Sequence, residues 1–162
     1  RYSDVGLDAS WQKALNSGTL SLQTRYVHEA KNLKASCALG LVGRGGVPWC
    51  ADVNLNEWRG DFGYHWHDKL GATVGLFSIT GERNANLYDS RTAKPDSNGV
   101  TLQVDYSPWG DGKGPLGPRV NLQLGAQFTA YGKFNGARHD YDGAGANAAD
   151  NDAIRLYGWL AF

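Results

Sequence analysis

The sequence predicts an all-β fold of antiparallel strands, and three observations support that prediction. Apolar and polar residues alternate with a period of two in segment after segment, which is the pattern of a strand with two different faces. Glycine (22 residues) and aromatic residues (12%) are abundant, which suits strands and turns better than helix packing. No run of about 18 apolar residues occurs, so a transmembrane helix is not expected.

Seven segments carry the alternation, and each is expected to form one strand: Thr19 to Glu29, Leu33 to Val42, Leu55 to His67, Leu70 to Thr80, Val100 to Ser107, Val120 to Thr129 and Ile154 to Phe162. In the third segment the aromatic Trp58 and Phe62 alternate with the charged Arg59 and Asp61. In the fourth both faces are apolar, so the pattern does not fix its register. The residues before Thr19 could supply an eighth strand.

The expected connections alternate in length. Long polar connections are expected at residues 43–54, 81–98 and 135–151, short ones at 30–32 and 67–69, and a Pro/Gly-rich turn of intermediate length at 108–119. Tight turns at one end of the strands and long loops at the other are typical of up-and-down outer-membrane barrels. We see no internal boundary, so residues 1–162 are expected to form a single β-barrel domain or the C-terminal part of one.

Three features favour a lipid-facing barrel over a soluble β-sandwich. The polar faces consist mostly of Gln, Asn, Thr, Ser and Gly, whereas the solvated faces of soluble sheets usually carry Lys and Glu. The strands have about ten residues, close to the roughly 9–11 that cross a bilayer when tilted. Aromatic residues gather toward strand ends, as they do at membrane–water interfaces: Tyr26, Trp58, Tyr64, Trp66, Tyr106, Trp109, Tyr157, Trp159 and Phe162.

The prediction is therefore an antiparallel up-and-down transmembrane β-barrel with seven or eight strands present. Single-chain bacterial barrels have an even number of strands, about eight or more, and an open half-barrel would leave unpaired edges in lipid. Two interpretations follow. The chain is either a small eight-stranded barrel or the end of a larger one, and we favour the larger one.

The end of the chain, Ile154-Arg-Leu-Tyr-Gly-Trp-Leu-Ala-Phe162, resembles the C-terminal assembly signal of bacterial outer-membrane proteins. The resemblance assigns that signal to Ile154, Leu156, Leu160 and Phe162. The segments 98–109 and 131–136 also resemble an uncharacterised group of proteobacterial porin-like proteins. This resemblance implies a location in the outer membrane of Gram-negative bacteria, with lipid and the barrel-assembly machinery as partners. Members are sometimes labelled as cytochromes, but no Cys-x-x-Cys-His motif occurs here, so no haem or other cofactor is expected.

Charged residues on the polar faces are the candidate functional groups. Arg25, Arg59, Asp61, Asp105 and Arg155 are expected to line the lumen, where fixed charges select among ions and solutes. The alternative is that they form inward salt bridges that fill a narrow, non-conducting barrel. The expected function is passive passage of small solutes or a scaffolding role, with self-association into a homo-oligomer left open. Because basic and acidic residues balance at 16 each, nucleic acid is not an expected partner.

Cys37 and Cys50 flank a Gly/Pro-rich segment. In an oxidising compartment such a pair is expected to form a disulfide that closes the loop between them. Two free thiols would require a cytosolic protein, which the other features do not favour.

Two further patterns match metal sites only loosely. His65 and His67 have the spacing of two ligands on one strand face, but no third ligand is apparent, and histidines at the rim of the lumen are favoured. The second pattern is a run of oxygen-bearing residues around a glycine: Asp140, Asp142, Gly143, Asn147, Asp150 and Asp152. It resembles a calcium loop without the final Glu of an EF-hand, and it is equally typical of a flexible external loop. No metal site is predicted.

The sequence contains no recognisable catalytic motif, since Gly-x-Ser-x-Gly is absent. We therefore predict that the protein is not an enzyme. Two alternatives stay open. One is an enzyme embedded in the outer membrane and built on His28, His65 or His139, because triads assembled in space are not visible in sequence. The other is a soluble extracellular β-sandwich that binds a partner through its aromatic surface.

Overall fold

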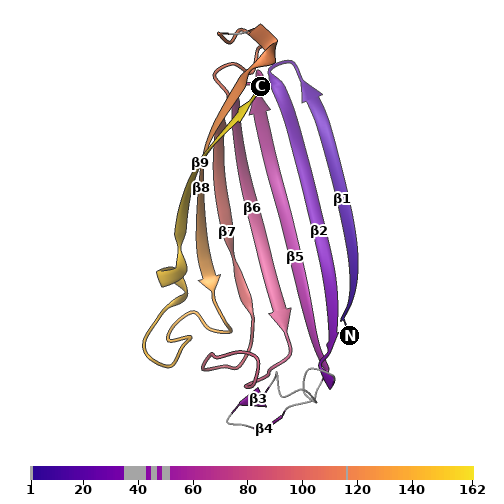
Figure 1. Cartoon of the computed structure of the whole chain (residues 1–162), viewed down its shortest axis with the longest axis vertical. Helices are drawn as coiled ribbons and strands as arrows, with labels where there is room; N and C mark the ends of the chain where they lie inside the picture. The colour runs from indigo at the N-terminus through magenta and orange to yellow at the C-terminus, as the bar shows by residue number, and fades with distance from the viewer. Residues whose placement is uncertain (1, 35–42, 45–46, 49–51, 116) are drawn as a thin grey trace.

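The computed structural model describes residues 2–34, 43–44, 47–48, 52–115 and 117–162. Seven strands form one antiparallel sheet in which sequence neighbours are also neighbours in space (Figure 1). They are β1 (Tyr2–Leu15), β2 (Gly18–Asn32), β5 (Asp52–Trp66), β6 (Leu70–Gly81), β7 (Ser97–Tyr106), β8 (Asn121–Lys133) and β9 (Ala153–Ala161). The prediction of an all-β antiparallel fold is confirmed. The sheet is not closed into a barrel, because β1 and β9 are its two edges.

Two-residue strands β3 (Gly43–Arg44) and β4 (Val47–Pro48) pair with each other, and two short 3-10 helices, η1 (Gly117–Arg119) and η2 (Ala148–Asn151), lie in connections. Among the described residues no helix is long and apolar enough to cross a membrane. The seven strands of the large sheet have 9 to 15 residues, so several exceed the predicted length.

The expected turn at residues 30–32 is wrong, and the seven strands are not the seven that the sequence predicts. β2 continues through the expected turn at 30–32 as far as Asn32, and it pairs directly with β5 over its whole length. No strand of the sheet lies between these two, so the expected strand from Leu33 to Val42 has no place there; its residues 35–42 lie outside the described part of the chain. The seventh strand is β1, from the segment considered as an eighth.

The connections lie at the two ends of the sheet, and the one between β7 and β8 departs from the expected division into short and long (Figure 1). The tight-turn end carries residues 16–17 and 67–69, and also the Pro/Gly-rich connection 107–120, which is nearly as long as 82–96. The long-loop end carries 82–96, 134–152 and the β3–β4 pair. At the β5–β6 turn both His67 (φ 47°) and Asp68 (φ 57°) are left-handed, and the Lys69 N–H donates to the Trp66 carbonyl at 3.1 Å, as in a type I′ turn. The Lys69 ammonium lies 2.9 Å from Asp111, and this hydrogen bond holds the pKa of the Asp111 carboxyl below its usual value.

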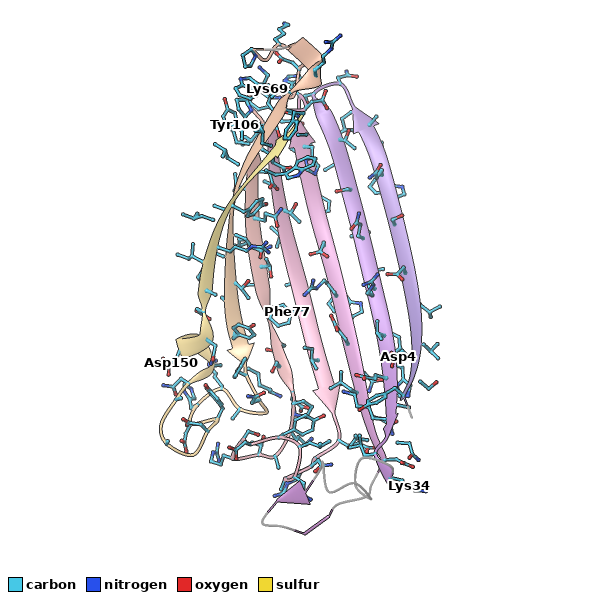
Figure 2. The ribbon with its side chains drawn as sticks, viewed as in Figure 1. Asp4, Lys34, Lys69, Phe77, Tyr106 and Asp150 are labelled. Carbon is cyan, nitrogen blue, oxygen red and sulfur yellow. The ribbon has the colours of Figure 1, made fainter. Side chains whose placement is uncertain are left out.

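The two faces of the sheet differ in character. On one, which we call the apolar face, directly paired residues form rows across six strands, such as Leu22, Phe62, Val74, Leu102, Phe128 and Ile154. On the other, the polar face, the adjacent row is Gln23, Asp61, Gly75, Thr101 and Thr129. Figure 2 shows side chains leaving the sheet on both sides.

On the central strands the apolar face is more exposed than the polar face, whereas both faces of β1 are exposed and both faces of β2 carry exposed residues. Along β6, for example, Leu76 on the apolar face is 51% exposed, while Gly71 and Gly75 on the polar face are buried. Among the described residues the buried hydrophobic side chains are Leu33, Val53, Ala93 and Ala148, all at the long-loop end. In the part of the chain that the structure describes, neither face of the sheet is therefore covered by an apolar core.

Candidate functional site

The five charged residues singled out in the sequence share the polar face. They come from four strands: Arg25 from β2, Arg59 and Asp61 from β5, Asp105 from β7 and Arg155 from β9. The strand register explains this, because residues paired across antiparallel strands project to the same side. A hollow of about 390 Å³ on this face is lined by Asp8, Ser10, Gln23, Arg25, Glu57, Arg59 and Asp61. The sequence did not single out Asp8 or Glu57, although alternation places Glu57 on the same face as Arg59; Asp8 joins them through the register of β1 and β2.

Arg25 and Arg59 are directly paired across β2 and β5, so two like charges lie opposite each other. Asp8 on the edge strand offsets one of them: Arg25 Nε donates a hydrogen bond to Asp8 Oδ1 at 2.7 Å. Within the described residues the guanidinium of Arg59 and the carboxylate of Asp61 have neither a hydrogen bond nor an ion pair. These two groups are therefore available to a solute in the hollow.

Asp105 has a different environment, because it is 6% exposed and enclosed by polar side chains. Gln103 Nε2 donates to its carboxylate at 2.7 Å and Gln123 Nε2 at 3.1 Å, and the Tyr157 hydroxyl makes a short hydrogen bond to it. The guanidinium of Arg155 lies 5.5 Å from the centre of the Tyr157 ring. This network joins β7, β8 and β9, so Asp105 holds the sheet together from its polar side.

A glycine makes room for this network. Gly125 is paired with Tyr157 across β8 and β9, and a Cβ added there would lie 2.1 Å from the Tyr157 ring. The aromatic ring thus covers a bare stretch of backbone. Sequence reasoning did not single out Gln103 or Gln123, although alternation places both on the polar face together with Asp105.

We expect Asp105→Ala to destabilise the protein by about 1–3 kcal/mol, because it leaves the Tyr157 hydroxyl and two amides without their acceptor. The measurement is urea unfolding of the full-length protein in detergent micelles or vesicles. Asp61→Ala is the matched control, since that carboxylate lies on the same face and has no partner in the described residues. Equal loss of stability in both variants would mean that the network contributes nothing specific.

Hydrogen bonds and an ion pair join the long loops at 82–96 and 134–152. Arg91 donates from Nε to the carbonyl of Asp140 at 2.7 Å, 49 residues away, and its guanidinium also lies 3.4 Å from the Asp140 carboxylate. Thr92 Oγ1 donates to the Asn135 carbonyl at 3.0 Å, and the Asn135 amide donates to Ser97 Oγ at 3.1 Å. These contacts form one folded cap at the long-loop end of the sheet.

The acidic residues considered for calcium act as acceptors for backbone amides. Asp142 Oδ1 accepts the N–H groups of Ala144 at 2.9 Å and Ala146 at 3.0 Å, and these bonds hold the pKa of the Asp142 carboxyl below its usual value. Asp140 Oδ1 accepts from Gly145 at 2.8 Å. Among the described residues no group of three or more metal-binding side chains comes together. The loop chemistry is that of Asx turns.

The histidines do not assemble into one site. His65 lies on the polar face of β5, whereas His67 is in the turn that follows, so the two side chains do not share one strand face. His28 lies opposite Asn56 on the same face as Tyr26 and Trp58, with 2.8 Å from Nδ1 to the Asn56 amide oxygen. His139 belongs to the long-loop cap, where its Nδ1 is 3.2 Å from Asn147 Oδ1.

The sequence predicts two further sites, a disulfide and an assembly signal. Cys37 and Cys50 lie outside the described residues, so their bridge stays a prediction. Ile154, Leu156 and Leu160 share the apolar face of β9 with exposed fractions of 75%, 76% and 52%, and Phe162 follows the end of the strand, 97% exposed.

The fold and these faces define an all-β protein built around one antiparallel meander, with a hollowed polar face and an exposed apolar face. Comparison with known proteins finds no matching family model, no matching curated protein and no matching solved structure.

Proposed function

We propose that the chain is part of a porin-like β-barrel in the bacterial outer membrane, with the polar face toward an aqueous lumen and the apolar face toward lipid. The observation that supports this is the exposure of the apolar face. Phe62 is 49% exposed, Val74 47% and Leu102 46%, in the middle of three neighbouring strands. A contiguous apolar patch larger than a few hundred Å² is rare on a soluble monomer.

Aromatic residues at two levels of the apolar face also support a lipid environment. Tyr26 and Trp58 form one pair toward the long loops, and Trp66 lies in the row of Leu70 and Tyr106 near the tight turns. Trp66 lies eight positions after Trp58 on β5, which is about 26 Å along the strand and about 20 Å along the barrel axis at a tilt of about 40°. The apolar band of outer-membrane barrels has a comparable height of about 25 Å and is flanked by aromatic girdles.

The two open edges favour a larger barrel over this sheet alone. β1 and β9 each have one paired neighbour in the described structure, and unpaired backbone groups are not tolerated in the hydrocarbon region. We infer that further strands complete the barrel and that lipid covers its outside. The assembly machinery would act on β9 and Phe162.

A soluble β-sandwich would require a second sheet against the apolar face, since sandwiches bury their apolar faces between two sheets. The part of the chain that the structure describes contains one large sheet and the two-residue pair β3–β4. Membrane fractionation together with heat-modifiable gel mobility separates the two proposals. A full-length protein found only in the soluble fraction would overturn the barrel.

The full-length protein in planar bilayers is expected to conduct ions, and Arg59→Glu is expected to shift its selectivity toward cations. The reason is that Arg59 is an unpaired fixed charge on the polar face, and reversing it raises the local concentration of cations. The measurement is the reversal potential in a salt gradient, with Arg59→Gln expected to be intermediate. If no variant conducts, the scaffold function replaces the pore.

A further inference from the structure

Four aromatic rings form a continuous chain from the long-loop cap onto the polar face. Phe77 of β6 meets Tyr131 of β8 with ring centres 5.4 Å apart, Tyr131 meets Phe134 at 5.1 Å, and Phe134 meets Tyr141 at 5.0 Å, each edge to face. Gly99 of β7 lies between the first two, and a Cβ added there would be 2.7 Å from the Phe77 ring. The glycine therefore lets the Phe77 ring lie over the backbone of β7.

Three of these rings form one wall of a hollow of about 320 Å³ on the polar face. Phe77, Tyr131 and Phe134 lie toward the long loops, and Figure 2 shows Phe77 on the sheet between the two ends. The rest of the lining includes the hydroxyls of Thr101 and Thr129. The volume is at the lower end of the roughly 300–1,000 Å³ typical of small-molecule sites.

The polar side of this hollow has unused hydrogen-bonding capacity. Within the described residues the side chains of Thr101, Thr129, Arg59 and Asp61 have no hydrogen-bond or ion-pair partner. Arg59 offers donors, Asp61 offers acceptors, and each threonine hydroxyl offers both. The charges of Arg59 and Asp61 cancel, so the hollow has no net preference for an anion or a cation.

These groups match the chemistry of a neutral sugar. A sugar ring presents an apolar C–H face, which packs on an aromatic ring, and a rim of hydroxyls, which both donate and accept hydrogen bonds. A purely apolar ligand would desolvate Arg59 and Asp61 without replacing their water. We propose that this hollow is a binding subsite for a neutral saccharide. It rests on the proposed function in one respect, since the solute reaches it through the lumen.

The test uses the full-length protein in detergent and a panel of neutral oligosaccharides: maltotriose, cellotriose, raffinose and diacetylchitobiose. Isothermal titration calorimetry should show saturable binding of at least one of them. Tyr131→Leu and Phe77→Leu are expected to weaken that binding about tenfold, since an aromatic contact contributes on that order. Phe128→Leu is the matched control, because Phe128 is an aromatic residue of the same strand on the apolar face, and it should bind as the unmodified protein does.

Calorimetry and conductance separate the two proposals. Binding without conductance would overturn the pore and keep the saccharide site. Conductance without saturable binding of any sugar in the panel would overturn the saccharide site and keep the pore. Equal weakening in Phe128→Leu and Tyr131→Leu, or none in the polar-face variants, would also overturn the site.

Discussion

Leu102→Arg is expected to prevent assembly of the full-length protein, whereas Thr101→Arg is expected to assemble normally. The two residues are neighbours on β7 and project to opposite faces. Leu102 belongs to the middle row of the apolar face, where an arginine would face lipid and cost about 2–4 kcal/mol near the midplane. Thr101 faces the hollow, where an arginine would stay hydrated.

The measurement is the fraction of each variant that shows heat-modifiable mobility in membrane fractions. Both variants carry the same new side chain on the same strand, so differences in charge or strand propensity cancel. The opposite result, with Thr101→Arg failing and Leu102→Arg assembling, would mean that the faces are assigned backwards. A soluble protein whose polar face meets solvent would then regain support.

Deleting Phe162 is expected to block assembly in cells without changing the stability of the refolded protein. The residue follows the end of β9 and is 97% exposed, so the sheet loses almost no contact when it is removed. The proposed assembly signal, in contrast, would make Phe162 a contact for the insertion machinery. Two measurements are needed: the amount of assembled protein in membranes, and urea unfolding after refolding in detergent.

Replacing Leu160 with Ala is a useful comparison, because Leu160 is an apolar residue of the same strand that pairs with Leu122. It should lower stability in the refolded protein and reduce assembly in proportion. If loss of Phe162 lowers stability as much as Leu160→Ala does, the terminal residue is a structural one. Normal assembly after its deletion would contradict the signal outright.

The alternation of side chains could be read from the sequence because it depends only on strand geometry. Trp58 and Phe62 lie on one face and Arg59 and Asp61 on the other as expected, since side chains alternate in any strand. The segment from Leu33 has the same alternation, but which strands pair is decided by the register between β2 and β5. A local pattern carries no information on that choice.

The candidate sites needed contacts that are distant in the sequence. The Asp105 network joins residues up to 52 positions apart, and the saccharide hollow draws its rings from β6 and from the segment around β8. Alternation identified a polar face, yet only the structure shows that Asp105 is enclosed while Arg59 is exposed. Sequence alone treated the two charges as equivalent.

The directions of the two edge strands restrict how such a sheet can close. Since seven strands alternate in direction, β1 and β9 both run from the long-loop end to the tight-turn end. Joining them directly would create a parallel pair, and so would placing two copies side by side around a common pore axis. Closure by antiparallel pairing alone requires an odd number of strands between β9 and β1. Parity, rather than size, is the constraint that any completed barrel containing this sheet must meet.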